Sequence, residues 1–216
     1  MTLSKSQYIR GLQCHKSLWL YKNRPELRDE VEESTESLFD RGYQVGDIAK
    51  ELFVNGVEIA FDSDDFDGMI AKTKELIADG TEIIYEATFK ENGIFAMVDI
   101  LVKNGSSWDM YEVKSSTKVK EYHINDTAIQ WYALFDTLNL NRAYVVHVNS
   151  EYTRDGEISA RALLSRVDIT EQVLQRQEEI PTKLHMIEKM LKGDTPDIDI
   201  GRHCSDPFGC DFKSYC

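Results

Sequence analysis

The sequence predicts an α/β protein in which helices flank one central mixed β-sheet. Apolar residues recur at helical spacing near both ends of the chain, three extended segments follow one another between residues 82 and 114, and a helix and a further apolar strand come after them. The chain has 216 residues, 42% of them hydrophobic, so it is long enough to bury a core and unlike a disordered or fibrous chain. We expect a single domain over residues 1–216.

Each element follows from a local pattern. Helices are expected over residues 4–21 (as one helix or two short ones), 34–53, 69–79, 125–138 and 170–192. Strands are expected over residues 57–61, 82–89, 94–102, 108–114, 143–148 and 158–164. Ser4 or Ser6 is expected to cap the first helix, Gly80 to stop the third, and Thr170 to cap the last, which Pro181 would kink.

The expected hairpin between residues 94 and 114 carries the most informative polar residues. Glu112 and Lys114 are two apart on a strand and therefore project from the same face. A two-residue loop at Asn104-Gly105, or a four-residue loop starting at Asn104, brings Asp99 to that face, and the four-residue loop sets it directly opposite Glu112. Either even-length loop therefore gathers two carboxylates and one ammonium.

Two carboxylates on an apolar face are costly unless they are paired or bind a cation. Oxygen ligands suit Mg²⁺ or Mn²⁺, and a lysine beside such an ion can stabilise charge on a phosphate or orient an attacking water. Glu86 is a candidate third acid if its strand neighbours the hairpin. The alternative is an ordinary salt bridge between Lys114 and Asp99 or Glu112.

The cysteines form a second constellation, with one near the N-terminus and three within the last 13 residues. They are Cys14, Cys204, Cys210 and Cys216. Four thiolates of this kind would fit a [4Fe–4S] cluster, while zinc and free buried thiols remain open alternatives and the absence of a secretion signal disfavours disulfides. Residues 1–25 and 200–216 would together form the lobe that binds the cluster.

In combination these residues resemble the PD-(D/E)XK nuclease superfamily, in its RecB-like iron–sulfur branch, which includes the CRISPR-associated adaptation exonuclease and the AddB nuclease domain. The likeness rests on Val98-Asp99, Glu112-Val113-Lys114, Gln130-Trp131-Tyr132 and the four cysteines, and it spans nearly the whole chain. It implies a restriction-endonuclease-like core whose termini are tied by the cysteine-ligated cluster. It also implies a metal-dependent deoxyribonuclease that acts as an exonuclease on single strands or ends.

The resemblance assigns roles to individual residues. Asp99 and Glu112, with the Val113 carbonyl, would bind the catalytic metal, Lys114 would assist the nucleophilic water, and Gln130 would position metal-site or substrate groups. The family's early-helix histidine is missing. Arg41-Gly42 is followed by Gly46 at the place of the histidine, and Asp47 or Glu51 could substitute.

The remaining expectations concern partners. The net charge is −13, which excludes a strongly basic phosphate-coating protein but not a nuclease, whose metals return positive charge locally. Lys118, Lys120 and Tyr122 follow the strand of Lys114 and could touch nucleic acid or lie in a solvated loop. No membrane partner and a cytoplasmic location are expected. Because the chain ends on Cys216, it could be the N-terminal module of a longer protein.

Two other functions fit the same sequence. One is a catalytically inactive nucleic-acid-binding module, in which Gly46 marks a decayed site. The other is a zinc-stabilised interaction domain with no role on nucleic acid.

Overall fold

A computed structural model describes residues 2–29 and 44–216. The described helices are α1 (Lys5–Gln13), α2 (His15–Asn23), α4 (Phe66–Ala78), α5 (Glu121–Leu134), α6 (Ala160–Leu163), α7 (Thr170–Gln177) and α8 (Ile180–Leu191). A helical stretch also covers residues 44–50, and 3₁₀ turns cover Pro25–Leu27 and Arg202–Cys204. The strands are β1 (Leu3–Ser4), β2 (Val57–Glu58), β3 (Ile83–Glu91), β4 (Ile94–Asn104), β5 (Ser107–Lys114), β6 (Leu140–Val148) and β7 (Leu164–Asp168).

The strands form one mixed sheet in the order β2-β3-β4-β5-β6-β7, with β1 pairing to β4 beside this path. Strands β3, β4 and β5 are antiparallel neighbours, whereas β5 and β6 run parallel. The connection from β5 to β6 passes through α5, as a parallel pair requires. The α/β class with a central mixed sheet and flanking helices is therefore confirmed.

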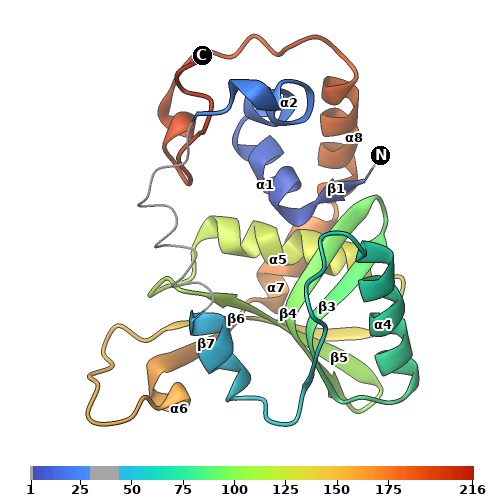
Figure 1. Cartoon of the computed structure of the whole chain (residues 1–216), viewed down its shortest axis with the longest axis vertical. Coiled ribbons are helices and arrows are strands. Elements are labelled where there is room, and N and C mark those ends of the chain that lie inside the picture. Colours follow the sequence, from blue (N-terminus) through green and yellow to red (C-terminus); the bar gives the residue numbers. More distant parts are fainter. Residues whose placement is uncertain (1, 30–43) are drawn as a thin grey trace.

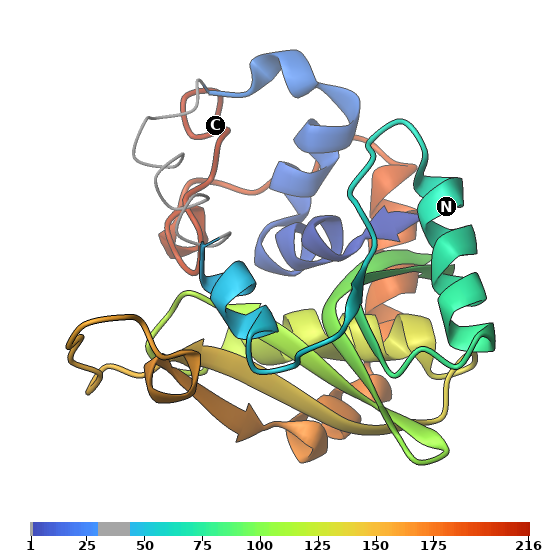
Figure 2. The same ribbon diagram turned by 60° about the horizontal axis from the view of Figure 1, so that its bottom comes forward.

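Each face of the sheet has its own hydrophobic core. Helices α1, α4, α5, α7 and α8 share the larger core with one face, and Ile129 of α5 and Met110 of β5 are fully buried in it. The helical stretch 44–50 packs on the other face, where Ala49 lies in the second core with Tyr111 and Val146. Figure 1 shows α5 and α7 on the opposite side of the sheet from α6 and residues 44–50, and Figure 2 shows the same layering from below.

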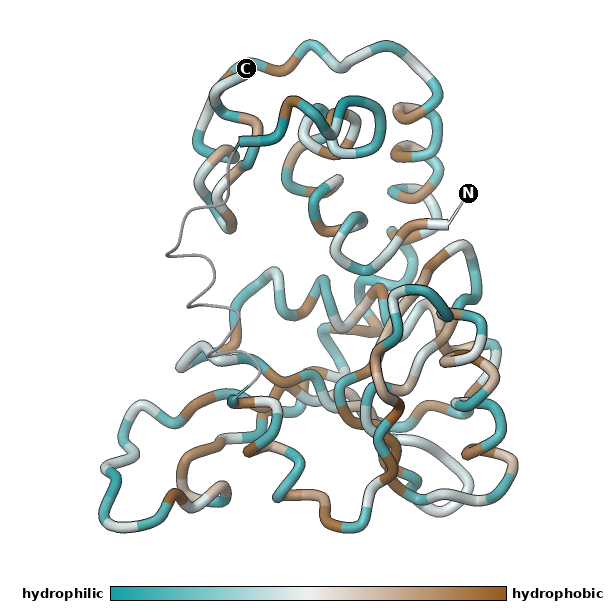
Figure 3. The backbone as a smooth tube through the Cα atoms, in the orientation of Figure 1, coloured by the Kyte–Doolittle hydropathy of each residue, from teal (hydrophilic) through white to brown (hydrophobic). Residues whose placement is uncertain are grey.

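The two ends of the chain meet above α5. Helices α1 and α2 lie beside α8 and the C-terminal tail (Figure 1), and hydrophobic residues of α8 face them while its hydrophilic residues face outward (Figure 3). Gln13 donates hydrogen bonds of 2.6 and 2.8 Å to the carbonyls of His203 and Phe208, and Lys16 donates one of 3.1 Å to the carbonyl of Ile198. The N-terminal helices and the tail thus form one lobe.

Several local expectations hold. Ser4 caps α1 through a capping box with Gln7, since each side chain accepts from the other's backbone N–H. The first helical segment is two short helices. The expected break near Pro181 is also found, because α7 ends at Gln177 and α8 begins at Ile180.

Other expectations are wrong. Residues 158–164 were expected to form a strand, but 160–163 form α6 and the strand begins at Leu164. Thr170 is the first residue of α7, not its cap; its N–H and hydroxyl both donate to Asp168. Helix α5 begins at Glu121, four residues before the expected start at 125.

The helix expected over residues 34–53 is only partly testable. Residues 44–50 are helical and residues 51–53 are not, while 34–43, including Arg41-Gly42, lie outside the described residues. Within the described residues, no helix has both the length and the apolar character needed to cross a membrane.

Candidate active site

Three carboxylates lie in a row across neighbouring strands. On β3 and β4, Tyr85 pairs with Ile100 and Ala87 with Val98, so Glu86 lies opposite Asp99. On β4 and β5, the pairs run from Asn104↔Ser107 to Ile100↔Tyr111, and the next step sets Asp99 opposite Glu112. This is the register expected for the longer hairpin loop, although the unpaired loop is only Gly105-Ser106.

The regular alternation of side chains between the two faces of the sheet is interrupted at this row. Val98 and Ile100 belong to the cores on opposite faces, although residues two apart on a regular strand share a face, and Tyr85 and Ala87 of β3 show the same change. Glu86 between them has φ +57°, in the left-handed region that costs a non-glycine residue free energy. Strands β3 and β4 therefore both kink at the acids.

The Asp99 carboxylate takes the place of a backbone carbonyl as hydrogen-bond acceptor between β4 and β5. Its Oδ2 accepts a hydrogen bond of 2.6 Å from the backbone N–H of Val113. Regular pairing of β4 with β5 begins only at Ile100, the residue after Asp99. The contact fixes Asp99 next to the backbone that joins Glu112 to Lys114, so the parts of this motif lie together.

Two ammonium groups and two carboxylates alternate beside this row. Lys114 Nζ lies 2.5 Å from Glu112 Oε1 and 2.5 Å from Asp126 Oδ2. Lys5 Nζ lies 3.0 Å from the same Glu112 oxygen and 3.7 Å from Asp126 Oδ2. The group joins β5, α5 and the start of α1, and buried charges of opposite sign compensate one another in it.

The charges set the protonation of the site. Burial alone would raise the pKa of Glu112, but Lys114 and Lys5 outweigh burial and hold that pKa well below its ordinary value. Burial would lower the pKa of Lys114, but Asp126 and Glu112 raise it well above its usual value. Lys114 is therefore an ammonium at neutral pH, able to donate hydrogen bonds but not to act as a base.

The other two acids in the row hold their protons more tightly. Burial, together with the charge of Glu112, raises the pKa of Asp99 to about 7. Burial likewise raises the pKa of Glu86, against the opposing effect of Lys5. A divalent cation near these oxygens would lower both pKa values, because opposite charge favours the ionised form.

Gln130 holds Glu112 from α5. Its Nε2 donates a hydrogen bond of 2.6 Å to Glu112 Oε2 and a longer one, 3.3 Å, to the carbonyl of Asp126. Its Oε1 is buried, and none of the described residues donates a hydrogen bond to it. An unpaired buried acceptor is costly, so this atom marks a place where a donor such as a water molecule would be stabilised.

The row of acids opens into a cavity of about 700 Å³. Glu86, Asp99 and Glu112 line it together with Val113 and Lys114. Further lining residues come from the helical stretch 44–50, from β2 and from the segment after it; they include Gly46, Asp47, Lys50, Glu58 and Phe61. The cavity therefore gives the carboxylates access to a ligand.

Gly46 stands where the nuclease family that the sequence resembles carries a histidine. Gly46 lines this cavity, and a Cβ at Gly46 would meet no atom within 4 Å, so a side chain would fit there. Asp47 also lines the cavity but forms an ion pair of 3.2 Å with Lys50, and its side chain is 76% exposed. Glu51 is exposed and does not line the cavity.

The three residues suggested for nucleic-acid contact do not lie at one site. Tyr122 lies in the first turn of α5 and lines a second cavity, which Lys114 also borders. Lys118 and Lys120 are exposed and do not line that cavity.

Sequence reasoning missed Asp126 and Lys5. Asp126 lies one helical turn before Gln130, a spacing that places both on one helix face, but it was expected only as the residue that starts the helix. Lys5 follows the capping serine of α1 and is separated from Glu112 by 107 residues, so no local pattern links it to the site.

The donor set has the chemistry of a hard divalent cation, namely carboxylate and carbonyl oxygens. As the side chains stand, however, the described residues contain no group of three or more His, Cys, Asp or Glu arranged to hold a metal ion. The contacts explain this for Glu112, because Lys5 and Lys114 both bind its Oε1.

All four cysteines belong to the N- and C-terminal lobe. None of the four forms a disulfide. Burial raises the pKa of the Cys216 thiol above its ordinary value, and the charges of the other three thiolates raise it further. The Cys14 sulfur accepts from the Ser17 N–H at 3.4 Å, and the Cys210 N–H donates to the Cys204 carbonyl at 3.0 Å. Their arrangement does not form a metal site within the described residues.

Comparisons with known proteins add little. No protein-family model and no curated protein matches the chain. Among solved structures, an alkaline exonuclease from Laribacter hongkongensis aligns at 12% identity and a TM-score of 0.47, over 88% of this chain and 90% of the exonuclease. The protein SSO0001 aligns at 13% identity and a TM-score of 0.46, over 100% of this chain and 85% of its own.

Proposed function

We propose that the protein is a divalent-metal-dependent nuclease that hydrolyses phosphodiester bonds in DNA, as an exonuclease on single strands or ends. The observation that carries the proposal is the row of Glu86, Asp99 and Glu112 across three strands with Lys114 on the same cavity. Three anionic groups and one fixed cation at a single opening suit a reaction in which charge develops on phosphate oxygens.

The roles follow from the geometry. Glu86, Asp99, Glu112 and the Val113 carbonyl would hold Mg²⁺ or Mn²⁺, which supplies Lewis acidity and lowers the pKa of water when bound. Lys114, kept charged by Asp126, donates hydrogen bonds to the attacking water or to a non-bridging phosphate oxygen. Gln130 keeps Glu112 oriented through the 2.6 Å hydrogen bond.

A structural [4Fe–4S] cluster is proposed for the cysteine lobe. The support is that one cysteine between α1 and α2 and three on the tail belong to the same lobe, and that the charges of the other three affect the Cys216 thiol. Four thiolates are the usual ligand set of such a cluster, which would hold the lobe beside the active site.

The test is cleavage of single-stranded and blunt-ended duplex DNA with Mg²⁺ or Mn²⁺. We expect degradation by the wild type, no activity in Asp99→Ala or Lys114→Ala, and wild-type activity in the surface control Lys72→Ala, which loses only an exposed pair with Glu75. Intact DNA under several metals would instead support a catalytically inactive module that binds nucleic acid.

A further inference from the structure

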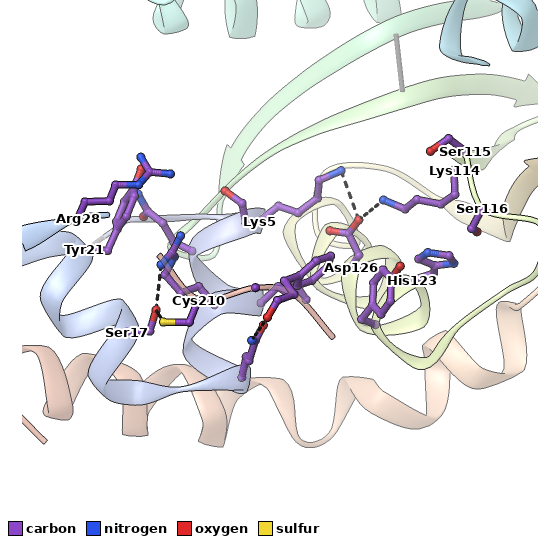
Figure 4. A pocket seen from close by; sticks show the side chains of 18 residues that line it. Lys5, Ser17, Tyr21, Arg28, Lys114, Ser115, Ser116, His123, Asp126 and Cys210 are labelled. Carbon is purple, nitrogen blue, oxygen red and sulfur yellow. Dashed lines mark hydrogen bonds and ion pairs between the residues drawn. The ribbon is translucent and has the colours of Figure 1, made fainter. Parts of the chain in front are cut away.

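A second cavity, of about 750 Å³, lies between the N- and C-terminal lobe and the start of α5. Lys5 and Lys114 border it at the active-site end, and Arg10 and Arg28 border it among the lobe residues. Figure 4 shows Arg28, Tyr21 and Ser17 at one end and Lys114, Ser115 and Ser116 at the other. Because Lys114 borders both cavities, this one adjoins the proposed reaction centre.

The charge of this cavity is opposite to that of the protein. The whole chain carries a net charge of −13, yet the described lining residues include four cationic side chains and a single carboxylate, Asp126. Asp126 is already paired with Lys114. Lys5 and Lys114 are compensated by Glu112 and Asp126, so the positive charge that can attract an anion lies at the Arg10 and Arg28 end of the cavity.

The end of the cavity at Arg10 and Arg28 carries a surplus of positive charge. Arg10 binds Asp211 through both terminal nitrogens, at 2.6 and 3.1 Å, and Arg28 Nε binds the same carboxylate at 2.5 Å. Two guanidinium groups share one carboxylate, so one positive charge is left uncompensated. Guanidinium donors in a fixed fork match the oxygens of a phosphate.

Aromatic rings also line the cavity, beside its cationic side chains. Tyr122 packs edge-to-face on Phe208, with ring centroids 4.7 Å apart, and the Arg10 guanidinium lies 4.8 Å from the ring centroid of Tyr21. All three rings line the cavity. Alternating cations and aromatic rings are the arrangement that holds the backbone and the unpaired bases of a single strand.

We propose that this cavity binds the stretch of single-stranded nucleic acid next to the scissile phosphate, with one phosphate held by Arg10 and Arg28. The inference rests on the proposed function and adds where the strand lies and what recognises it. The volume lies in the range of pockets that enclose one small organic ligand, so it accommodates about one or two nucleotides and not a duplex. The shared chemistry is a phosphate, either inside the strand or at its end.

The experiment measures binding separately from cleavage. A dye-labelled single strand of about 12 nucleotides is titrated with protein without added divalent ions, and fluorescence anisotropy is followed at several salt concentrations. Arg28→Gln is the informative variant, because its side chain is 46% exposed and Arg10 keeps its own bond to Asp211. Arg24→Gln is the matched control, since Arg24 is paired with Glu26 and does not line the cavity.

We expect Arg28→Gln to bind the strand about tenfold more weakly, the loss of one charge-assisted contact, and to show a salt dependence shallower by about 0.7. Arg28→Lys should keep the wild-type salt dependence, and Arg24→Gln should match the wild type. Oligonucleotides with and without a terminal phosphate separate the two sources. If a terminal phosphate strengthens binding in the wild type but not in Arg28→Gln, the cavity holds the end of the strand. If the terminal phosphate does not strengthen binding, the cavity holds an internal phosphodiester.

The inference is overturned if Arg28→Gln binds like Arg24→Gln, or if the wild type does not bind the strand. Its failure differs from failure of the proposed function. A protein that cleaves DNA normally with Arg28→Gln binding unchanged would refute only the cavity's role. A protein that never cleaves DNA but binds it through Arg28 would refute only the nuclease.

Discussion

Lys114 of β5 and Asp126 of α5 are joined by a contact of 2.5 Å between Nζ and Oδ2. The contact orients the ammonium over the carboxylate row and keeps it charged. We expect Asp126→Asn to lower the rate of DNA cleavage about tenfold, since Lys114 loses one of its two close partners while the row of acids remains. Initial rates at saturating metal measure this. Asp136→Asn, which alters an exposed carboxylate bonded to Asn92, should cleave at the wild-type rate.

Lys5 contributes to stability as well as to the charge of the site. Lys5→Met leaves Glu112 and Asp126 with one ammonium in place of two. The expected loss in the free energy of unfolding is about 2 kcal/mol, less than for a fully buried pair because 23% of the Lys5 side chain is exposed. Urea denaturation measures it. Lys72→Met removes an equal charge from a surface pair and should change stability by less than about 0.5 kcal/mol.

Asp99 makes stability depend on pH. Its pKa is raised to about 7 by burial and by Glu112, whereas the pKa of an aspartate in the unfolded chain is about 4. Between these values the unfolded chain loses a proton that the folded protein keeps, so the free energy of unfolding falls as pH rises from about 4 to about 7. The decrease should be about 4 kcal/mol and end above about pH 7.

Asp99→Asn isolates this effect, because the amide oxygen can still accept from the Val113 N–H but cannot ionise. Denaturation curves between pH 4 and pH 8 should show a smaller decrease for the variant than for the wild type. Parallel curves for the two proteins would mean that another group carries the pH dependence.

The cysteine lobe has an optical test. Protein purified without oxygen should be coloured and contain iron, and Cys14→Ser or Cys210→Ser should lose both colour and iron. Ser205→Ala, on the same tail, should keep them. A colourless protein that contains zinc would support the zinc-stabilised alternative, and one with no metal would support free thiols.

The sequence predicted the acid row better than its surroundings. Asp99 and Glu112 could be aligned because an even-length hairpin loop fixes the parity of side chains across two strands. Glu86 needed only the fact that β3 neighbours β4. These relations depend on strand periodicity, a property of short segments.

What escaped prediction depends on contacts between distant segments. The Lys5–Glu112 contact spans 107 residues and depends on the pairing of β1 with β4. A strand of two residues is too short for a sequence pattern to predict that pairing. The kink at Glu86 and Asp99 is likewise hard to predict, because a glutamate rarely adopts the left-handed φ that Glu86 has. The helix α6 replaced an expected strand since its four residues are too few to show a period.

The Arg10–Asp211 contact joins residues 201 positions apart. During synthesis Arg10 emerges from the ribosome about two hundred residues before Asp211, so the sheet and its acids can fold before the proposed strand-binding cavity is complete. A nascent chain would then carry the reactive groups without a hold on DNA, and would gain it only when the segment around Asp211 docks. The order of synthesis alone would thus delay any cutting until that segment has emerged.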